Sequence, residues 1–471
     1  NPPCMPMHGD GTDRLMDRLI ATTHLQVKKP ERRNIVEQNR QTRREFLKNT
    51  VAASAALAAA ELAVPRSVHA AGSDVIRYGM IGCGGRCSGA AMDAMHADPS
   101  VHLVAMCDLF ADRVQAKYES LKSQMPKQVE VDKEHMFVGL DGYKKVIDSV
   151  DVVLIACAAK FHPMYSMAAI KAGKHVFVEK PHGIDPLGVK LMQATCDLAK
   201  EKNLGILSGL HRRFDPAMRE TVKRIQDGAI GEIVAIEENF IRPPYGVDRR
   251  HEGQGELQFQ YANQYRFSWL CGDDVTQSLV HNLDRARWIL KEMNPVKCHG
   301  LAGRATCLDR AYIYGDVFDH HSVVYQYENG LRLYAFCRTA PGCYNEESGI
   351  IMGSKGIAYP ESHRIQGQGG TWRYQGERVS PYENEHLEYY RSIRAGKPIN
   401  CGGYMAQSTK IAMMGELSCY SGQEVTWEQV SKSDFHFGPK PEDCTWDMEP
   451  PVKPDATGTY PVAVPGKTKI L

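Results

Sequence analysis

Residues 75–89, VIRYGMIGCGGRCSG, join an apolar run to a glycine loop, and an Ala- and Met-rich run from Ala90 to Met95 follows. This order predicts strand, tight loop and helix, the context in which a glycine motif binds a dinucleotide. Gly82 permits the turn, Gly84 lets the backbone approach a pyrophosphate, and the helix N-terminus offers N–H groups. The third motif position holds Cys87 instead of Gly or Ala, so we expect a slightly wider helix–strand spacing. The predicted cofactor contacts in the loop are Gly82, Cys83, Gly84, Gly85 and Arg86.

An acid closes the next predicted strand. The run from Val101 to Cys107 ends at Asp108, which lies 26 positions (108 − 82) after Gly82. A carboxylate in this place accepts hydrogen bonds from the adenosine ribose and repels a 2′-phosphate, so the sequence favours NAD over NADP. Arg86 and Arg113 keep NADP as the alternative, and a helix cap is the structural alternative for Asp108.

Strand-like and helix-like runs alternate from here to residue 210. The predicted strands are 151–157, 175–179 and 205–210, and the predicted helices are 164–172 and 186–202. This alternation predicts a doubly wound parallel sheet. Cys157, Ala158 and His162 follow the first of these strands and are further candidate cofactor contacts.

The segment His175-Val176-Phe177-Val178-Glu179-Lys180-Pro181 ends a buried strand with an acid, a lysine and a proline. Proline cannot continue a central strand, so we expect the strand to end near Glu179. Lys180 then lies at the carboxyl end of the sheet, where open α/β sheets bind ligands. The alternative is that Lys180 is an ordinary solvated residue just after a strand.

Together these motifs and Arg212-Arg213-Phe214-Asp215-Pro216 resemble the glucose–fructose oxidoreductase / inositol dehydrogenase (Gfo/Idh/MocA) family over residues 74 to 430. The resemblance implies a Rossmann domain followed by an α/β domain with a large, open, mostly antiparallel sheet. Strand-like runs at 232–240, 321–327, 331–338 and 350–352 agree with it. Because such a sheet leaves apolar area uncovered, we expect a homo-oligomer, dimer or tetramer.

Family members commonly combine the lysine of Glu-Lys-Pro with an Asp and a His four residues apart in a later helix. The matching positions are Lys180, Gln277 and His281. An amide cannot carry a proton as a carboxylate does. Either His281 works without the acid, or Asp273, Asp274 or Asp284 replaces it, or the chemistry differs. Helical periodicity predicts that Gln277, His281 and Asp284 or Arg285 share one face.

The resemblance implies reversible hydride transfer at a carbinol carbon of a sugar, polyol or related ring. His281 would remove the hydroxyl proton and Lys180 would stabilise the oxygen. Glu179 would orient Lys180 or contact the ribose, and Arg213 would face the nicotinamide or pair with an acid. The alternatives are an NAD-dependent glycosidase or lyase that uses transient oxidation, and a non-catalytic carbohydrate-binding protein.

The amino end predicts export. Thr42-Arg43-Arg44-Glu45-Phe46-Leu47-Lys48 is a twin-arginine pattern, an apolar run (51–64) follows it, and Val68-His69-Ala70 offers a cleavage site. We expect a removed signal (42–70), a periplasmic or other extracytoplasmic enzyme, and a tightly held NAD that is recycled in one site. Residues 1–41 are expected to be a disordered extension or an artefact.

Composition fits a two-domain enzyme that binds no nucleic acid and has no membrane span after the signal: 471 residues, net charge +1 and 43% hydrophobic residues. The fourteen cysteines are expected to be free thiols. His320 and His321 point to opposite faces of a strand, so no metal site is expected.

The predicted domains are 71–210 (Rossmann), 211–430 (α/β) and a Pro-rich arm, 431–471, that is either a linker or an ordered arm on a neighbour. The helical stretch 404–420 should return to cover either domain.

Overall fold

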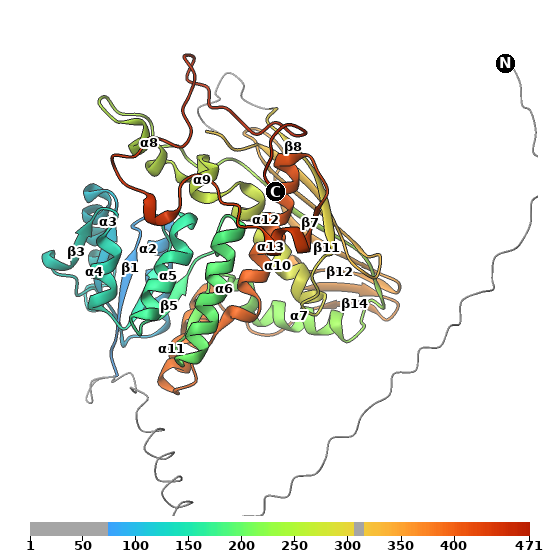
Figure 1. The fold of residues 1–471 in the computed structure, drawn as a ribbon. Helices are drawn as coiled ribbons and strands as arrows, with labels where there is room; N and C mark the ends of the chain where they lie inside the picture. Colours follow the sequence, from blue (N-terminus) through green and yellow to red (C-terminus); the bar gives the residue numbers. More distant parts are fainter. Residues whose placement is uncertain (1–73, 306–314) are drawn as a thin grey trace, which may run out of the picture. The chain divides into compact units, whose positions relative to one another are not determined.

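The computed structural model describes residues 74–305 and 315–471, and its first part is a Rossmann domain (Figure 1). Its strands are β1 (Ile76–Ile81), β2 (Val101–Asp108), β3 (Met136–Val138), β4 (Val152–Ile155), β5 (His175–Val178) and β6 (Ile206–Ser208). Its helices are α2 (Gly85–Ala97), α3 (Ala111–Gln124), α4 (Gly142–Ser149), α5 (His162–Lys171) and α6 (Pro186–Glu201). The twin-arginine segment lies outside the described residues.

The six strands form one parallel sheet in the order β3-β2-β1-β4-β5-β6, which confirms the predicted doubly wound topology. β1 lies between β2 and β4, so the loop after Ile81 emerges at the point where the strand order reverses. β4 and β5 are buried at every position, as the continuous apolar runs predicted. β5 ends at Val178, next to the predicted boundary.

The second domain is built on a nine-stranded sheet in the order β14-β13-β12-β11-β7-β10-β9-β8-β15. Only β10 and β7 pair in parallel, so the prediction of a mostly antiparallel sheet is confirmed. The strands are β7 (Ile233–Arg242), β8 (Lys297–Gly303), β9 (His320–Gln326), β10 (Arg332–Thr339), β11 (Glu346–Gly353), β12 (Gly356–Tyr359), β13 (Arg364–Gly367), β14 (Gly370–Arg373) and β15 (Val425–Thr426).

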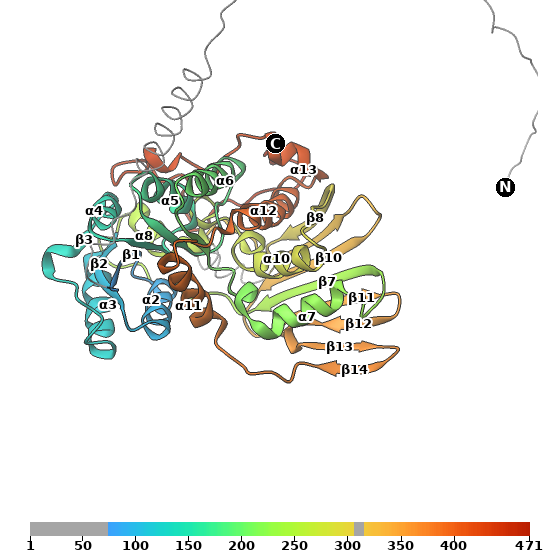
Figure 2. The same ribbon diagram turned by 90° about the horizontal axis from the view of Figure 1, so that it is seen from below.

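Helices cover one face of this sheet (Figure 2). The α-helices are α7 (Pro216–Gln226), α8 (Glu256–Ala262), α9 (Ser268–Cys271), α10 (Val280–Ile289), α11 (Pro381–Arg394), α12 (Met405–Ser421) and α13 (Trp427–Lys432). α10 packs on β7, and α12 packs on β8, β9 and also on α6 of the Rossmann domain. The expected return of the 404–420 helix is therefore confirmed. Along β9 buried and half-exposed residues alternate, so the other sheet face is open.

The C-terminal arm lies along its own chain. Trp446 contacts Phe110 of the Rossmann domain and Tyr261 of α8 edge-on, with ring centroids 6.1 and 5.3 Å apart. Tyr460 is buried and donates a hydrogen bond to Glu256 at 2.6 Å. Of the two predicted alternatives the ordered arm is therefore the one observed, and these contacts are with its own chain, so packing on a neighbouring subunit stays a prediction.

Among the described residues the cysteines are free, and all are buried except Cys157, which is half-buried, and Cys343, which is exposed. This confirms the expected free thiols for that part of the chain. Within residues 74–305 and 315–471, no helix is long and apolar enough to cross a membrane.

Candidate active site

A pocket opens at the carboxyl end of the parallel sheet, beside the glycine loop. Gly82 has φ +103°, and an added Cβ would lie 2.9 Å from the Ala156 carbonyl, so this turn requires glycine. At Gly84 an added Cβ would meet no protein atom within 4 Å. The fold itself therefore leaves space at Gly84, and α2 starts there without a side-chain cap. These features fit a pyrophosphate at the N-terminus of α2.

Asp108 lines this pocket. Its carboxylate accepts the backbone N–H of Cys83 at 2.7 Å and that of Phe110 at 3.1 Å. The side chain thus holds the glycine loop and keeps its remaining lone pairs for a ribose. Arg113 lines the same pocket but is paired with Asp248 at 2.5 Å.

The predicted cofactor residues fall into two groups. The residues that line the pocket are Gly82, Gly84, Asp108, Cys157 and Ala158. The other predicted cofactor residues are not among those that line it: Cys83, Gly85, Arg86, His162, Glu179, Lys180 and Arg213. The pocket also has walls from outside the Rossmann domain, since Tyr261 and Gln264 complete it.

Arg86 and Glu179 form a buried ion pair, with Nε 2.8 Å from the Glu179 carboxylate. Asp93 also binds the Arg86 guanidinium, which lies over the Tyr382 ring. Glu179 accepts the backbone N–H of Lys180 at 3.1 Å. Of the two predicted roles for Glu179, the structure supports the positioning of Lys180. Arg86 is held by two acids, and its contact with the cofactor stays a prediction.

His162 is a structural residue of the same edge. It is buried, and Nδ1 lies 2.8 Å from the carbonyl oxygen of Pro181, so this nitrogen donates. Burial lowers the pKa of His162 to about 4, which keeps the ring neutral. His162 therefore anchors the turn that carries Lys180 and does not line the glycine-loop pocket, and its contact with the cofactor stays a prediction.

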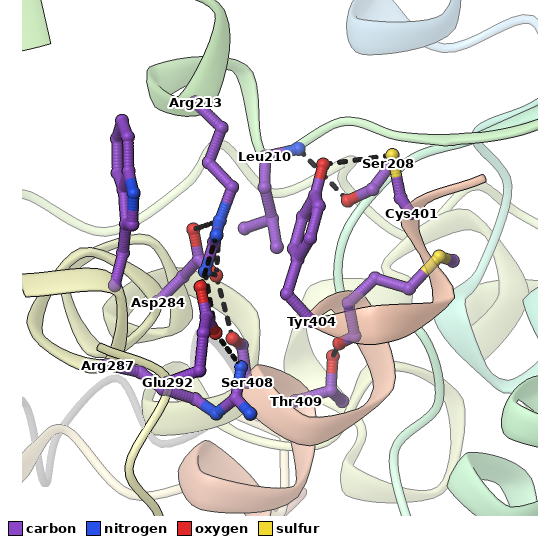
Figure 3. A network of polar contacts seen from close by, with 12 residues as sticks. Ser208, Leu210, Arg213, Asp284, Arg287, Glu292, Cys401, Tyr404, Ser408 and Thr409 are labelled. Atoms are coloured by element: carbon purple, nitrogen blue, oxygen red, sulfur yellow. Dashed lines mark hydrogen bonds and ion pairs between the residues drawn. The ribbon is translucent and has the colours of Figure 1, made fainter. Parts of the chain in front are cut away.

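Arg213 lies in a separate polar network (Figure 3). Its guanidinium pairs with Asp284 at 2.8 Å and with Glu292 at 2.7 Å, and it stacks on Tyr404. Ser408 donates to the same Asp284 carboxylate at 2.7 Å. Of the two predicted roles for Arg213, the pairing with an acid is the one observed.

Lys180 reaches across to the second domain. Its Nζ donates to the main-chain carbonyl of Gln277 at 2.6 Å. Gln277 lies in a π-helical turn, η5 (Val275–Leu279), that precedes α10. Such a turn is wider than an α-helical one and is frequent at functional sites.

The prediction that Gln277 and His281 share one helical face is wrong, because a π turn interrupts the regular helix. Gln277 lines a small polar pocket with Arg242 and Asp274, whereas His281 lines a different pocket. Farther along α10, Asp284 pairs with Arg213, and Arg285 is fully buried against Glu238. The 3.6-residue period assumed a regular α-helix through Gln277, and the inserted turn breaks it.

None of the three candidate acids has a contact with His281 among the described residues. Asp273 accepts from Tyr420 at 2.7 Å and lies 3.1 Å from Nε2 of His321. Asp274 pairs with Arg242 at 2.5 Å and accepts from Ser278. With Asp284 held by Arg213, two alternatives remain: His281 works without a neighbouring carboxylate, or the chemistry differs.

A second pocket, which we call the histidine pocket, lies beyond Lys180. It contains three histidines, three acids and several aromatic and apolar side chains. Its lining is His211, Arg212, Asp215, Met218, Phe240, His281, Glu347, Glu361, His363, Pro381 and Tyr382. Arg212 pairs with Glu347 and Glu361, which neutralises much of this charge. A wall of paired polar groups suits a neutral, polyhydroxylated ligand.

The sequence reasoning missed His211 and Tyr382. His211 follows β6 at once, in the 3₁₀-helix η3 (His211–Phe214), so the carboxyl end of the last parallel strand was the available signal. Tyr382 begins α11, which packs on α2. No local pattern in the sequence connects α11 with the glycine loop.

Residues 76–208 match the sequence model of the Gfo/Idh/MocA oxidoreductase family, which is described as having an NAD-binding Rossmann fold. The first domain of this chain is therefore similar to the NAD-binding domain of that family. The chain is 26% identical over 293 residues to inositol 2-dehydrogenase from Rhizobium meliloti, an alignment of 61% of this chain and 76% of the relative.

Two further similarities are a shorter sequence alignment and a shared fold. A dTDP-3,4-didehydro-2,6-dideoxy-α-D-glucose 3-reductase from Actinomadura kijaniata is 26% identical over 192 residues, so the chain spans only 51% of that relative. The structure of myo-inositol 2-dehydrogenase from Lactobacillus plantarum aligns with TM-score 0.58 and 24% identity over 75% of this chain and 99% of that one. The two-domain architecture is therefore shared with inositol dehydrogenases.

Proposed function

We propose that this protein is an NAD-dependent oxidoreductase that acts on a CH–OH group of a sugar, polyol or related carbohydrate. The observation that carries the proposal is the position of Lys180. It closes β5 at the cofactor edge, bonds to η5, and is near enough to His281 for its charge to lower the pKa of that ring. A cation and a base thus converge between the cofactor pocket and the histidine pocket.

Each residue has a definite task in this reaction. The substrate lies in the histidine pocket, with its hydroxyl oxygen between Lys180 and His281. His281 accepts the hydroxyl proton, and Lys180 donates a hydrogen bond to the oxygen as negative charge develops on it. The bound nicotinamide supplies the acceptor for the hydride. Glu179 and His162 hold the turn that carries Lys180.

NAD is the proposed cofactor because the cations near the adenosine end are already paired. Arg113 binds Asp248, and Arg86 binds Glu179 and Asp93, while Asp108 adds negative charge to the pocket. The negative charge of Asp108 would repel the 2′-phosphate of NADP.

Slow release of the cofactor is part of the proposal. Tyr261 and Gln264 of the second domain form walls of the pocket, and Trp446 of the arm packs on Phe110 and Tyr261. NAD therefore leaves only when these contacts open. A cofactor held in this way suits the export that the twin-arginine pattern predicts, and we propose a periplasmic or other extracytoplasmic location.

The open face of the nine-stranded sheet supports a homo-oligomer. Leu301 of β8 is 75% exposed, and its neighbour Gly300 faces Cys419 of α12, so Leu301 points to the open face. Covering such side chains with a second copy removes apolar area from water. Sedimentation of the purified protein tests this part of the proposal, and a monomer at all concentrations contradicts it.

The activity is tested with the purified protein and a panel of myo-inositol, D-glucose and methyl β-D-glucoside. We expect the absorbance of reduced nicotinamide to rise with at least one of them when NAD⁺ is present. Release of p-nitrophenol from a nitrophenyl glycoside without net NADH would instead indicate the glycosidase alternative. Binding of these sugars without either signal would indicate a carbohydrate-binding protein.

A further inference from the structure

Two histidine rings from different elements meet in the histidine pocket. His211 and His281 lie 5.1 Å apart in an edge-to-face arrangement, and Tyr382 stacks on the other side of His211 at 4.0 Å. Nδ1 of each histidine is buried and has no hydrogen-bond partner. An unpaired buried nitrogen is costly in a folded protein, so the pair points to a proton or ligand that it receives during the reaction.

His281 is surrounded by positive charge. Burial lowers its pKa well below the ordinary 6.5, and Lys180, His211, Arg212 and Arg86 lower it further. Within the described residues, no carboxylate makes a hydrogen bond or an ion pair with this ring. An imidazolium formed on His281 would therefore lie beside the Lys180 ammonium without compensation. The proton needs a second acceptor close by.

We propose that His211 is the proton-accepting partner of His281, in place of the carboxylate that the chain lacks beside that ring. This inference rests on the proposed function. His211 acts through His281, so it is a positioning residue for proton transfer and not the group that first removes the proton.

The pocket gives His211 a route for the proton. His211 lines the histidine pocket, so its ring can pass a proton to water there, while Glu347 and Glu361 of the same wall are paired with Arg212. The groups that face His211 are Arg212, Arg86 and Lys180, which lower its pKa together with burial, and the carbonyl of Gly209, which raises it. The ring is therefore neutral before the reaction and able to accept a proton.

The steps balance as follows. The O–H bond of the substrate breaks and an N–H bond forms on His281. That N–H bond breaks as one forms on His211, and water in the pocket then takes the proton. The electron pair of the substrate C–H bond leaves with the hydride, so one carbonyl, one reduced nicotinamide and one released proton result.

The test is the variant His211→Ala, to which a small-molecule base is then supplied from solution. Removing a proton-transfer partner should lower kcat by about 10²-fold, a larger change than that in KM, with NADH affinity within about twofold of the original. Added imidazole should restore part of kcat with a pH dependence that follows its neutral form. Thiazole has a similar size but is a much weaker base, so it should not restore kcat. The control is His299→Ala, because His299 is exposed on β8.

Several outcomes overturn the inference. An unchanged kcat, equal rescue by imidazole and thiazole, or a loss that imidazole does not restore at any pH would each assign His211 a structural role. If His211→Ala does not fold, His211→Gln keeps a polar side chain and the same pH profile is measured.

A second measurement needs no substrate and separates this inference from the proposed function. In protein with ¹³C-labelled histidine and bound NADH, His211→Gln should change the titration of His281, because two rings this close titrate as a coupled pair. An unchanged titration of His281 would show that the rings are not coupled and would overturn the inference. Failure of the whole sugar panel with wild-type protein would overturn the proposed function instead.

Discussion

The ammonium group of Lys180 donates a hydrogen bond to the main-chain carbonyl of Gln277 at 2.6 Å. The first residue belongs to the turn after β5 and the second to the π-helical turn before α10, 97 positions later. This single bond connects the cofactor edge of the Rossmann domain with the helix that carries His281. It also uses the main chain of Gln277, so the residue type at that position is free to differ from aspartate.

Lys180→Met should lower turnover by about 10²- to 10³-fold, the size expected when one donor to a developing oxyanion is removed. NADH should still bind, because Lys180 is not part of the adenosine pocket. Lys174→Met is the matched control, since Lys174 also donates to a carbonyl but lies before the amino end of β5. Steady-state rates and NADH fluorescence titrations check both, and full turnover in Lys180→Met would remove this residue from the mechanism.

Asp108→Asn should weaken NADH binding by about 10-fold or more, because hydrogen bonds to a charged acceptor contribute about 1.5–3 kcal/mol. The amide oxygen still accepts the Cys83 N–H, so the glycine loop keeps its support. NADPH should lose less affinity than NADH, since the repulsion of the 2′-phosphate falls. Fluorescence titrations measure both constants, with Asp112→Asn on exposed α3 surface as control. An unchanged NADH/NADPH ratio would mean that Asp108 does not select the cofactor.

Trp446→Ala should speed the release of NADH by about 5- to 10-fold, because aromatic pairs contribute about 0.5–1.5 kcal/mol beyond their buried area. The ring contacts with Phe110 and Tyr261 are lost and the pocket opens more often. Stopped-flow displacement by excess NAD⁺ gives the rate. Trp372→Ala is the control, since Trp372 lies on β14 and contacts Arg224. Equal release rates in the two variants would show that the arm does not retain the cofactor.

Glu416→Gln should change how stability depends on pH. Burial and the nearby Asp273 raise the pKa of Glu416 to about 8 from its ordinary 4.5. The folded state therefore holds this proton more tightly, and the resulting stability is complete below pH 4.5 and lost as pH rises through about 8.

Glutamine resembles the protonated acid and its oxygen still accepts the Thr276 N–H. The variant should match wild-type Tm near pH 5 and exceed it by several degrees above pH 8, at about 2–4 °C per kcal/mol. Thermal melts from pH 5 to 9 check this. Two parallel curves would mean that Glu416 is ionised in the folded protein throughout this range.

Much of the Rossmann domain was predictable because its signals are local. The apolar run 175–178 and Pro181 mark the end of a buried strand, and Gly82 and Gly84 mark a turn that approaches a phosphate. The mostly antiparallel second sheet followed from the family resemblance and from Gly and Asn turns. The strands that were predicted lie within a few residues of their predicted bounds. The differences arise because β-sheet ends depend on neighbouring strands as well as on local sequence.

The active site was predictable only in part. Lys180 and His281 follow from motifs, but the role of Arg86, His162 and Arg213 depends on partners that are distant in sequence. In the sequence, Arg213 is interpreted as a cation near the nicotinamide or as a partner of an acid. Only the folded structure shows that it pairs with Asp284 and Glu292. The π turn at Gln277 was not predictable, because a 3.6-residue period assumes a regular helix.

The sequence by itself determined the dinucleotide-binding fold, the lysine at the end of β5 and the absence of an aspartate four residues before His281. These properties depend on residues next to one another in the chain, where steric and hydrogen-bonding rules act directly. Only the tertiary structure decided which acids are already paired and that His211 lies beside His281. Such facts arise from packing between separate elements, and packing brings together residues that no local pattern connects.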